Sequence, residues 1–237
     1  MPQFCSGQPA ACLMKPKAYY PIFANLTGRR CVVVGGGPIA QRKVTTLLRH
    51  GAQVTLVSPT LTARLRVLAQ HGTMTHVPRR FRPADLRGAW LVYGATDDEH
   101  INKLVARSAE RQRIFTNIVD QTPLCSFIAP AISRRGPLTI AVSTGGASPS
   151  LAKNVRDQLA ATLGREVPPM LRLLAQLRGV AKRRLPVYKD RKRYFARLVR
   201  GRVFELVRRN KAREAKREAL RLLAHEARRC SNGARHA

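Results

Sequence analysis

The stretch from Arg30 to Pro59, RCVVVGGGPIAQRKVTTLLRHGAQVTLVSP, decides the fold of this chain. Its residues 31–34 form a short apolar run rich in β-branched side chains, which is typical of a strand buried on both faces of a parallel sheet. Three glycines, 35–37, follow directly, and Ala40 completes a GxGxxA pattern. The stretch therefore predicts a buried strand that ends in a tight glycine turn.

The residues after the glycines predict a helix and then a second strand. Pro38 stands in the first helical turn, where a missing N–H is tolerated. Apolar residues at 40, 44, 47 and 48 share one helical face, Gly51 is placed to end the helix, and residues 53–57 have the composition of a strand. The helix of such a βαβ unit presents free N–H groups to a pyrophosphate, so we predict dinucleotide binding. The alternative is a flavodoxin-like sheet with a tight turn and no ligand.

The end of the second strand lacks the acid that usually binds the ribose hydroxyls of a dinucleotide. The residues at this end are Val57, Ser58, Pro59 and Thr60. Ser58 and Thr60 offer hydroxyl groups that can hydrogen-bond a ribose. The motif alone therefore does not separate NAD from NADP.

The composition predicts acidic partners. The chain has 237 residues, with 44 Lys or Arg against 13 Asp or Glu and a net charge of +31, which favours nucleic acid, a membrane surface, or a polycarboxylate or phosphate ligand. Five cysteines, none in CxxC spacing, indicate neither a disulfide framework nor a permanent metal site, and fit the cytoplasm. No apolar run is long enough to span a bilayer, and residues 1–18 are expected to be a flexible extension.

Two further predicted strands end in polar residues. Residues 90–95 predict a buried strand, after which Asp97 or Asp98 caps a helix over 99–111. Thr96, at the carboxyl end of this strand, is a cofactor-binding candidate, because ligands of open α/β folds bind there. Asp120 ends the next strand, 114–119, and is either a turn-forming residue or a general base held beside the cofactor.

The pattern changes after this strand. Residues 126–133 and 138–143 predict two strands joined by a hairpin turn. The small and hydroxyl residues Thr144, Gly145, Gly146 and Ser148 then form a loop whose amides suit carboxylates, or a flexible joint, before a helix that ends near residue 163. From residue 167 the chain is helix-forming and strongly basic, with an apolar stripe that we expect to pack on the sheet domain or on a second chain.

The motifs YYPIF, VVVGGGPIAQRK, GATDDEHIN, NIVD, SFIAPAI and VSTGGASPSLA occur in this order between residues 19 and 152. In this combination the chain resembles precorrin-2 dehydrogenase/sirohydrochlorin ferrochelatase, the dehydrogenase-chelatase part of siroheme synthase. The resemblance implies oxidation of precorrin-2 to sirohydrochlorin with NAD as cofactor, then insertion of Fe²⁺, as a substrate, to form siroheme. It implies a cytoplasmic homodimer with an acidic tetrapyrrole substrate.

The resemblance also assigns roles to single residues. It places Asp120 on the acid that serves both reactions. The NAD-contacting positions of the family fall on a set in the two turns that follow the first two strands: Gly35, Gly37, Pro38, Ile39, Pro59 and Thr60. The basic helices are more heavily charged than the family pattern.

The expected architecture is an α/β fold: a Rossmann-like NAD-binding domain over 19–121, a small α+β dimerisation and substrate segment over 122–164, and a basic helical domain over 165–237 with a frayed tail. Two other functions stay open. One is a non-catalytic NAD-binding regulator that uses the basic helices on nucleic acid, which the lack of a recognition motif and of interleaved aromatic residues disfavours. The other is a dehydrogenase without chelatase activity.

Overall fold

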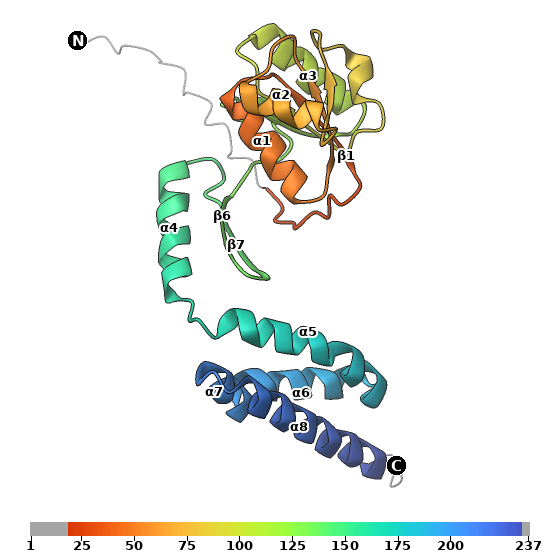
Figure 1. The fold of residues 1–237 in the computed structure, drawn as a ribbon, viewed down its shortest axis with the longest axis vertical. Helices are drawn as coiled ribbons and strands as arrows, with labels where there is room; N and C mark the ends of the chain where they lie inside the picture. The colour runs from red at the N-terminus through yellow and green to blue at the C-terminus, as the bar shows by residue number, and fades with distance from the viewer. Residues whose placement is uncertain (1–18, 234–237) are drawn as a thin grey trace, which may run out of the picture. The chain divides into compact units, whose positions relative to one another are not determined.

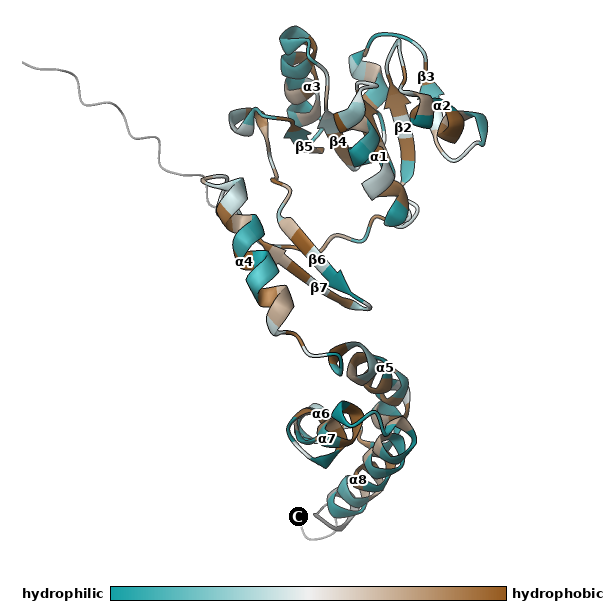
Figure 2. Cartoon of the chain, turned by 60° about the vertical axis from the view of Figure 1, so that its left-hand side comes forward, coloured by the Kyte–Doolittle hydropathy of each residue, from teal (hydrophilic) through white to brown (hydrophobic). Residues whose placement is uncertain are grey.

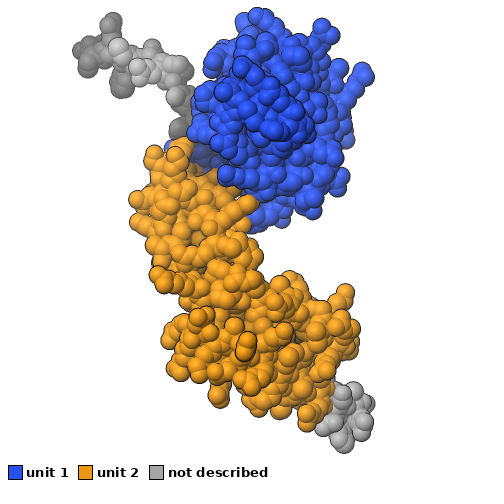
Figure 3. Space-filling model, viewed as in Figure 1, with its two compact units in different colours: residues 1–129, 145–147 blue, residues 130–144, 148–237 orange. Residues whose placement is uncertain are grey.

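A computed structural model describes residues 19–233. The chain divides into two compact units (Figure 3), the first formed by residues up to 129 with 145–147, and the second by residues 130–144 with 148 onward. Each is described by itself. The predicted extension over residues 1–18 lies outside the described residues, and the finer division at residues 121 and 164 stays a prediction.

The first unit is built on a parallel five-stranded sheet with the order β3-β2-β1-β4-β5. The predicted βαβ unit forms the centre of this sheet, because Arg30 pairs with Gln53 and Val34 with Val57 in parallel register. All five strands end at one edge of the sheet, and the order reverses between β1 and β4. The strands are β1 (Arg30–Val34), β2 (Gln53–Val57), β3 (Thr75–Val77), β4 (Leu91–Gly94) and β5 (Phe115–Ile118).

Helices cover both faces of this sheet (Figure 1). Alternate residues of β1 explain how: Val32 packs in one core with helix α3 (Glu99–Arg111), and Val33 packs in another with helices α1 (Pro38–Arg49) and α2 (Ala63–Gln70). In Figure 2 strands β2 and β4 carry mostly hydrophobic colours, as expected for strands inside the sheet with both faces covered. The predicted Rossmann-like α/β architecture is confirmed.

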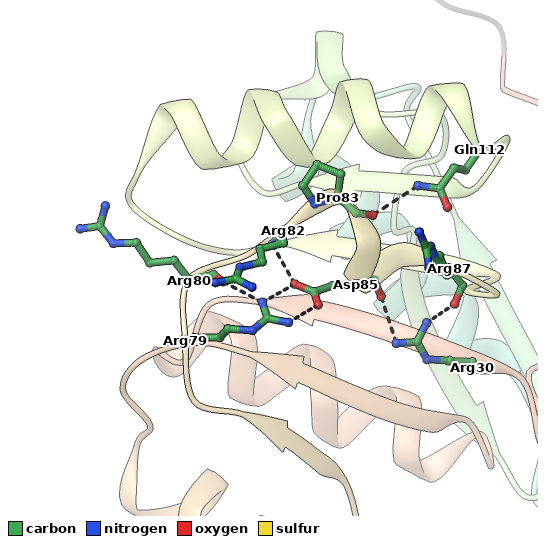
Figure 4. A network of polar contacts seen from close by, with 8 residues as sticks. All are labelled: Arg30, Arg79, Arg80, Arg82, Pro83, Asp85, Arg87 and Gln112. Atoms are coloured by element: carbon green, nitrogen blue, oxygen red, sulfur yellow. Dashed lines mark hydrogen bonds and ion pairs between the residues drawn. The ribbon is translucent and has the colours of Figure 1, made fainter.

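An ion pair between a partly exposed arginine and a buried aspartate fixes the segment between β3 and β4 (Figure 4). Arg79 donates to both carboxylate oxygens of Asp85, at 2.9 and 2.7 Å, and the backbone N–H of Arg82 donates to Oδ2 at 2.8 Å. Arg30, at the start of β1, donates to the backbone oxygens of Asp85 and Arg87. The 3₁₀ turn Pro83–Leu86 is therefore held to the start of the central strand β1.

The second unit begins with the predicted hairpin. Strands β6 (Ala131–Arg135) and β7 (Leu138–Val142) pair antiparallel, and helix α4 (Pro149–Thr162) packs on both. The predicted strand over 126–133 is wrong at its start, because residues 126–130 are irregular. Ser126 is instead used locally, with its Oγ accepting from the backbone N–H of Thr116 at 2.7 Å.

The basic helices form a core of their own, drawn from α5 (Val167–Arg184), α6 (Tyr188–Arg200), α7 (Arg202–Arg208) and α8 (Ala212–Gly233). The predicted apolar stripe is divided between two helices, because α6 ends and α7 begins at Gly201. Leu198 and Val203 are fully buried on either side of the break, whereas Val199 is exposed. At the centre, the fully buried Glu226 accepts hydrogen bonds from Arg193 and Arg197. The expected packing of the stripe on the sheet domain or on a second chain is therefore wrong, because the stripe packs on other helices of the same unit.

Candidate nucleotide-binding site

The glycine turn after β1 is shaped by neighbouring backbone. A Cβ on Gly35, whose φ is +116°, would lie 2.1 Å from the carbonyl oxygen of Ala95 in the turn after β4. A Cβ on Gly36 would lie 1.8 Å from the carbonyl oxygen of Thr60 in the turn after β2. The turns that follow the three central strands therefore lie in contact, and both glycines are required for that contact.

The third glycine faces open space. A Cβ on Gly37 would meet no atom within 4 Å, and Gly37 is the N-cap of α1 without any side-chain cap. The other two helices named as covering this sheet, α2 and α3, are each capped by a side-chain oxygen, from Thr62 and Asp98. No side chain accepts from the first-turn N–H groups of α1, so these groups are available to an anion. Pro38, at the first helical position, has no N–H. This cradle fits the pyrophosphate of a dinucleotide.

The turn after β2 closes over the glycines. Thr62 donates from its backbone N–H to Gly36 O at 3.1 Å and from its hydroxyl to Gln41 Oε1 at 2.7 Å. Ser58 is only 5% exposed and packs against Gly36, whereas Pro59 and Thr60 are exposed. Of the two hydroxyl residues proposed for the ribose, Thr60 is the accessible one.

The turn after β4 is fixed by a residue that the sequence analysis did not single out. Asn102 on α3 is 4% exposed, and its amide donates to the carbonyl oxygen of Thr96 at 2.9 Å. The Thr96 hydroxyl accepts from the N–H of Asp98 at 3.2 Å, and Asp98, one of the two predicted caps, accepts from Ile101. Thr96 therefore lies at the carboxyl edge of the sheet, beside the glycine turn. One sign of this role in the sequence is that Asn102 lies four residues, about one helical turn, after the cap residue Asp98.

Asp120 lies at the same edge, in the turn after β5, exposed and with a φ of +59°. A cysteine that the sequence analysis also missed supports this turn: Cys125 Sγ accepts from Ile118 N at 3.2 Å and contacts Gln121 O at 3.4 Å. Ile118 ends the strand and Gln121 follows Asp120. The backbone around the carboxylate is thereby held on both sides.

Lys43 is a third residue that the pattern did not reveal. Its Nζ lies 4.6 Å from the centroid of the Tyr93 ring on β4. Burial lowers the pKa of Lys43 and Arg42 lowers it further, while Cys125 and Asp120 act in the opposite direction. The charge of Asp120 therefore favours the protonated form of this partly buried lysine.

The loop proposed for substrate carboxylates closes on itself. The Thr144 hydroxyl donates to Ser148 O and accepts from Ser148 N, both at 3.0 Å, and Gly145 and Gly146 have φ of +65° and +93°. Ser148 Oγ caps α4 by accepting from Leu151 N. Both hydroxyls are thus engaged within the loop. Among the described residues no group of three His, Cys, Asp or Glu is placed to hold a metal ion.

The fold and the glycine cradle define a dinucleotide-binding α/β protein. Three family models match the chain in succession: putative NAD(P)-binding over residues 22–131, sirohaem biosynthesis protein central over 135–162, and sirohaem synthase dimerisation region over 168–223. The chain belongs to the siroheme synthase family, of which it carries the NAD(P)-binding, central and dimerisation regions. Within residues 19–233 no helix is both long and apolar enough to cross a membrane.

Siroheme synthases are among the most similar curated proteins. The one from Thioalkalivibrio sulfidiphilus is 40% identical over 205 residues, and the one from Neisseria meningitidis is 37% identical over 205 residues. These alignments cover 85% and 86% of this chain but only 42% and 43% of the relatives. Among solved structures, SirC, a precorrin-2 dehydrogenase, matches with a TM-score of 0.70 and 27% identity, over 86% of this chain and all of SirC.

Proposed function

We propose that this protein oxidises precorrin-2 to sirohydrochlorin with NAD, and that it then inserts ferrous iron to form siroheme. The observation that carries the proposal is the placement of Asp120 at the same sheet edge as the glycine cradle, in a chain of the siroheme synthase family. Bound NAD supplies the hydride acceptor. A base is then needed for the proton that leaves with the hydride, and the exposed carboxylate of Asp120 meets that need.

The same carboxylate suits the second reaction. Iron enters the macrocycle as the pyrrole nitrogens lose their protons, so one base at the edge of the sheet can act in both steps. In this proposal the iron is a substrate held by the macrocycle. A polycarboxylate substrate also gives the net charge of +31 a purpose, because arginine pairs with carboxylates and a basic surface steers them.

The proposal includes a homodimer in the cytoplasm. The match to the sirohaem synthase dimerisation region over residues 168–223 supports a dimer. The loop Thr144, Gly145, Gly146 and Ser148 is proposed to bind tetrapyrrole carboxylates; the hydroxyls of Thr144 and Ser148 are hydrogen-bonded within the loop.

The test is anaerobic incubation of the protein with precorrin-2 and NAD⁺, followed by absorbance, with Fe²⁺ or Co²⁺ added afterwards. We expect sirohydrochlorin to form first and its metal complex second. Formation of sirohydrochlorin without metal insertion would indicate a dehydrogenase that lacks chelatase activity. Failure of both steps, together with salt-dependent DNA binding, would favour the nucleic-acid-binding regulator.

The role of Asp120 is tested by Asp120→Ala and Asp120→Asn. We expect both variants to bind NAD⁺ like the wild type and to lose dehydrogenation by about 100-fold or more, which is the contribution of a general base. Calorimetric titration with NAD⁺ is the control for an intact cofactor site. Full turnover in either variant would contradict the assignment.

A further inference from the structure

Aromatic side chains line one side of the last two strands of the parallel sheet. Tyr93 of β4 packs in the same core as Val33 and α1, and the ring of Phe127 contacts it edge to face, with 5.6 Å between the centroids. Phe127 contacts Phe115 of β5 in the same way, at 6.3 Å. Helix α1 packs on β1 and β2, whereas α3 packs on β4 and β5 from the opposite face. On the α1 side, β4 and β5 therefore carry a row of aromatic rings.

Lys43 extends from α1 to these rings. Its Nζ lies 4.6 Å from the centroid of the Tyr93 ring, and its side chain is partly buried. Burial removes water from an ammonium group, and the face of an aromatic ring replaces part of that lost interaction. None of the ion pairs within residues 19–233 includes Lys43. The positive charge is therefore held in a defined place without a carboxylate to neutralise it.

This lysine lies near the base proposed for the oxidation. The charges of Asp120 and Cys125 both act on Lys43, so its ammonium is within electrostatic reach of the turn after β5. Lys43 also lies on the helix whose first turn forms the glycine cradle. The cradle, the ammonium and the proposed base therefore border the same part of the sheet.

We propose that the ammonium of Lys43 binds a side-chain carboxylate of the tetrapyrrole and thereby places the macrocycle against the proposed base. The inference rests on the proposed function and adds a substrate-binding residue to it. A lysine supplies charged N–H donors, which form strong hydrogen bonds to a carboxylate. The aromatic rings beside it offer an apolar surface to the macrocycle. The alternative is a lysine that extends along an apolar surface only to keep its charge in water.

The test is titration of the full chain with sirohydrochlorin, followed by absorbance, in the wild type and three variants. Lys43→Met keeps the apolar stem and removes the charge, and Lys43→Arg keeps both. Arg42→Met is the matched control, because Arg42 is the neighbouring cation on α1 and is exposed. We expect Lys43→Met to bind sirohydrochlorin about tenfold or more weakly, as for loss of a charged hydrogen bond. Lys43→Arg should stay within about threefold of the wild type, and Arg42→Met within about twofold.

Turnover provides a second measurement. In Lys43→Met the KM for precorrin-2 should rise while kcat changes little, as expected when an interaction shared by the substrate and the transition state is lost. The affinity for NAD⁺, measured by calorimetric titration, should not change.

Three results would overturn the role of Lys43. The first is an affinity of Lys43→Met for sirohydrochlorin equal to that of the wild type. The second is an equal loss of NAD⁺ affinity, which would indicate an effect on the cofactor site or on the fold. The third is an equal loss in Arg42→Met, which would indicate general attraction by the basic surface. If the wild type converts precorrin-2 and Lys43→Met binds normally, only the role of Lys43 fails, whereas a wild type that neither binds sirohydrochlorin nor converts precorrin-2 refutes both proposals.

Discussion

Replacing Gly37 by aspartate should strengthen the fold and abolish cofactor binding. Gly37 has φ −82° and ψ −175°, which any residue adopts, and its Cβ position is open, so the backbone and the packing both tolerate a side chain. Aspartate is also a preferred N-cap, and α1 has no side-chain cap. We therefore expect the free energy of unfolding of Gly37→Asp to rise by about 0.5–1 kcal/mol.

The same carboxylate would occupy the place of the pyrophosphate. It satisfies first-turn N–H groups that a phosphate needs, and it adds a like charge at about 4 Å, where two unit charges repel by about 4 kcal/mol at an effective dielectric constant of about 20. Affinity for NAD⁺ should fall by about a thousandfold, since about 1.4 kcal/mol corresponds to a factor of ten. Calorimetric titration with NAD⁺ and urea unfolding measure the two effects on one sample.

Gly36→Ala is the matched control, because its Cβ would overlap the carbonyl oxygen of Thr60. This variant should lose stability and cofactor binding together, whereas Gly37→Asp should separate them. An NAD⁺ affinity of Gly37→Asp within threefold of wild type would refute the placement of the pyrophosphate at the start of α1. A large loss of stability would refute the open position of the side chain.

Two further predictions concern buried carboxylates. The hydrogen bonds from Arg79 hold the pKa of Asp85 below 3.8, so Asp85→Asn should cost about 2 kcal/mol at pH 7. The difference in unfolding free energy between the wild type and Asp85→Asn, measured by urea titration, should shrink as the pH falls through the lowered pKa of Asp85. The wild type then loses the same interaction by protonation. Burial acts to raise the pKa of Glu226, yet its two arginine partners hold it below the ordinary value. Replacing Arg193 and Arg197 by methionine should lower the free energy of unfolding by about 3 kcal/mol. Adding Glu226→Leu to this variant should restore most of the lost stability in the same urea assay.

The parts of the fold that depend on residues within one short segment were predictable from the sequence. The GxGxxA turn, Pro38 and the cap at Asp98 fix where helices begin, and these elements lie where they were predicted. The hairpin was predicted from its turn residues, but its first strand begins at Ala131, five residues late. Residues 126–130 have a strand-like composition, and hydrogen bonds to Thr116 on another strand override it.

Contacts that depend on how one element folds back on its neighbour were not predicted from the sequence pattern. Asn102 and Cys125 reveal their roles only once α3 lies beside β4 and the turn after β5 folds back on its own strand. The apolar stripe of the basic helices predicted burial but not its partner, because an amphipathic face does not identify the surface that covers it. Its partners are the other helices of the same unit.

The sequence left two interpretations of Asp120 open, a turn-forming residue and a general base, and the two are compatible. The left-handed φ of +59° explains why a short polar residue stands there, since Asp and Asn adopt this conformation more readily than other side chains. The turn needs only the backbone of Asp120, however, and asparagine would serve it equally. Eight of the chain's acids form ion pairs within residues 19–233, and Asp120 is not one of them. The turn thus explains the conformation of the residue, and the proposed proton transfer explains its charge.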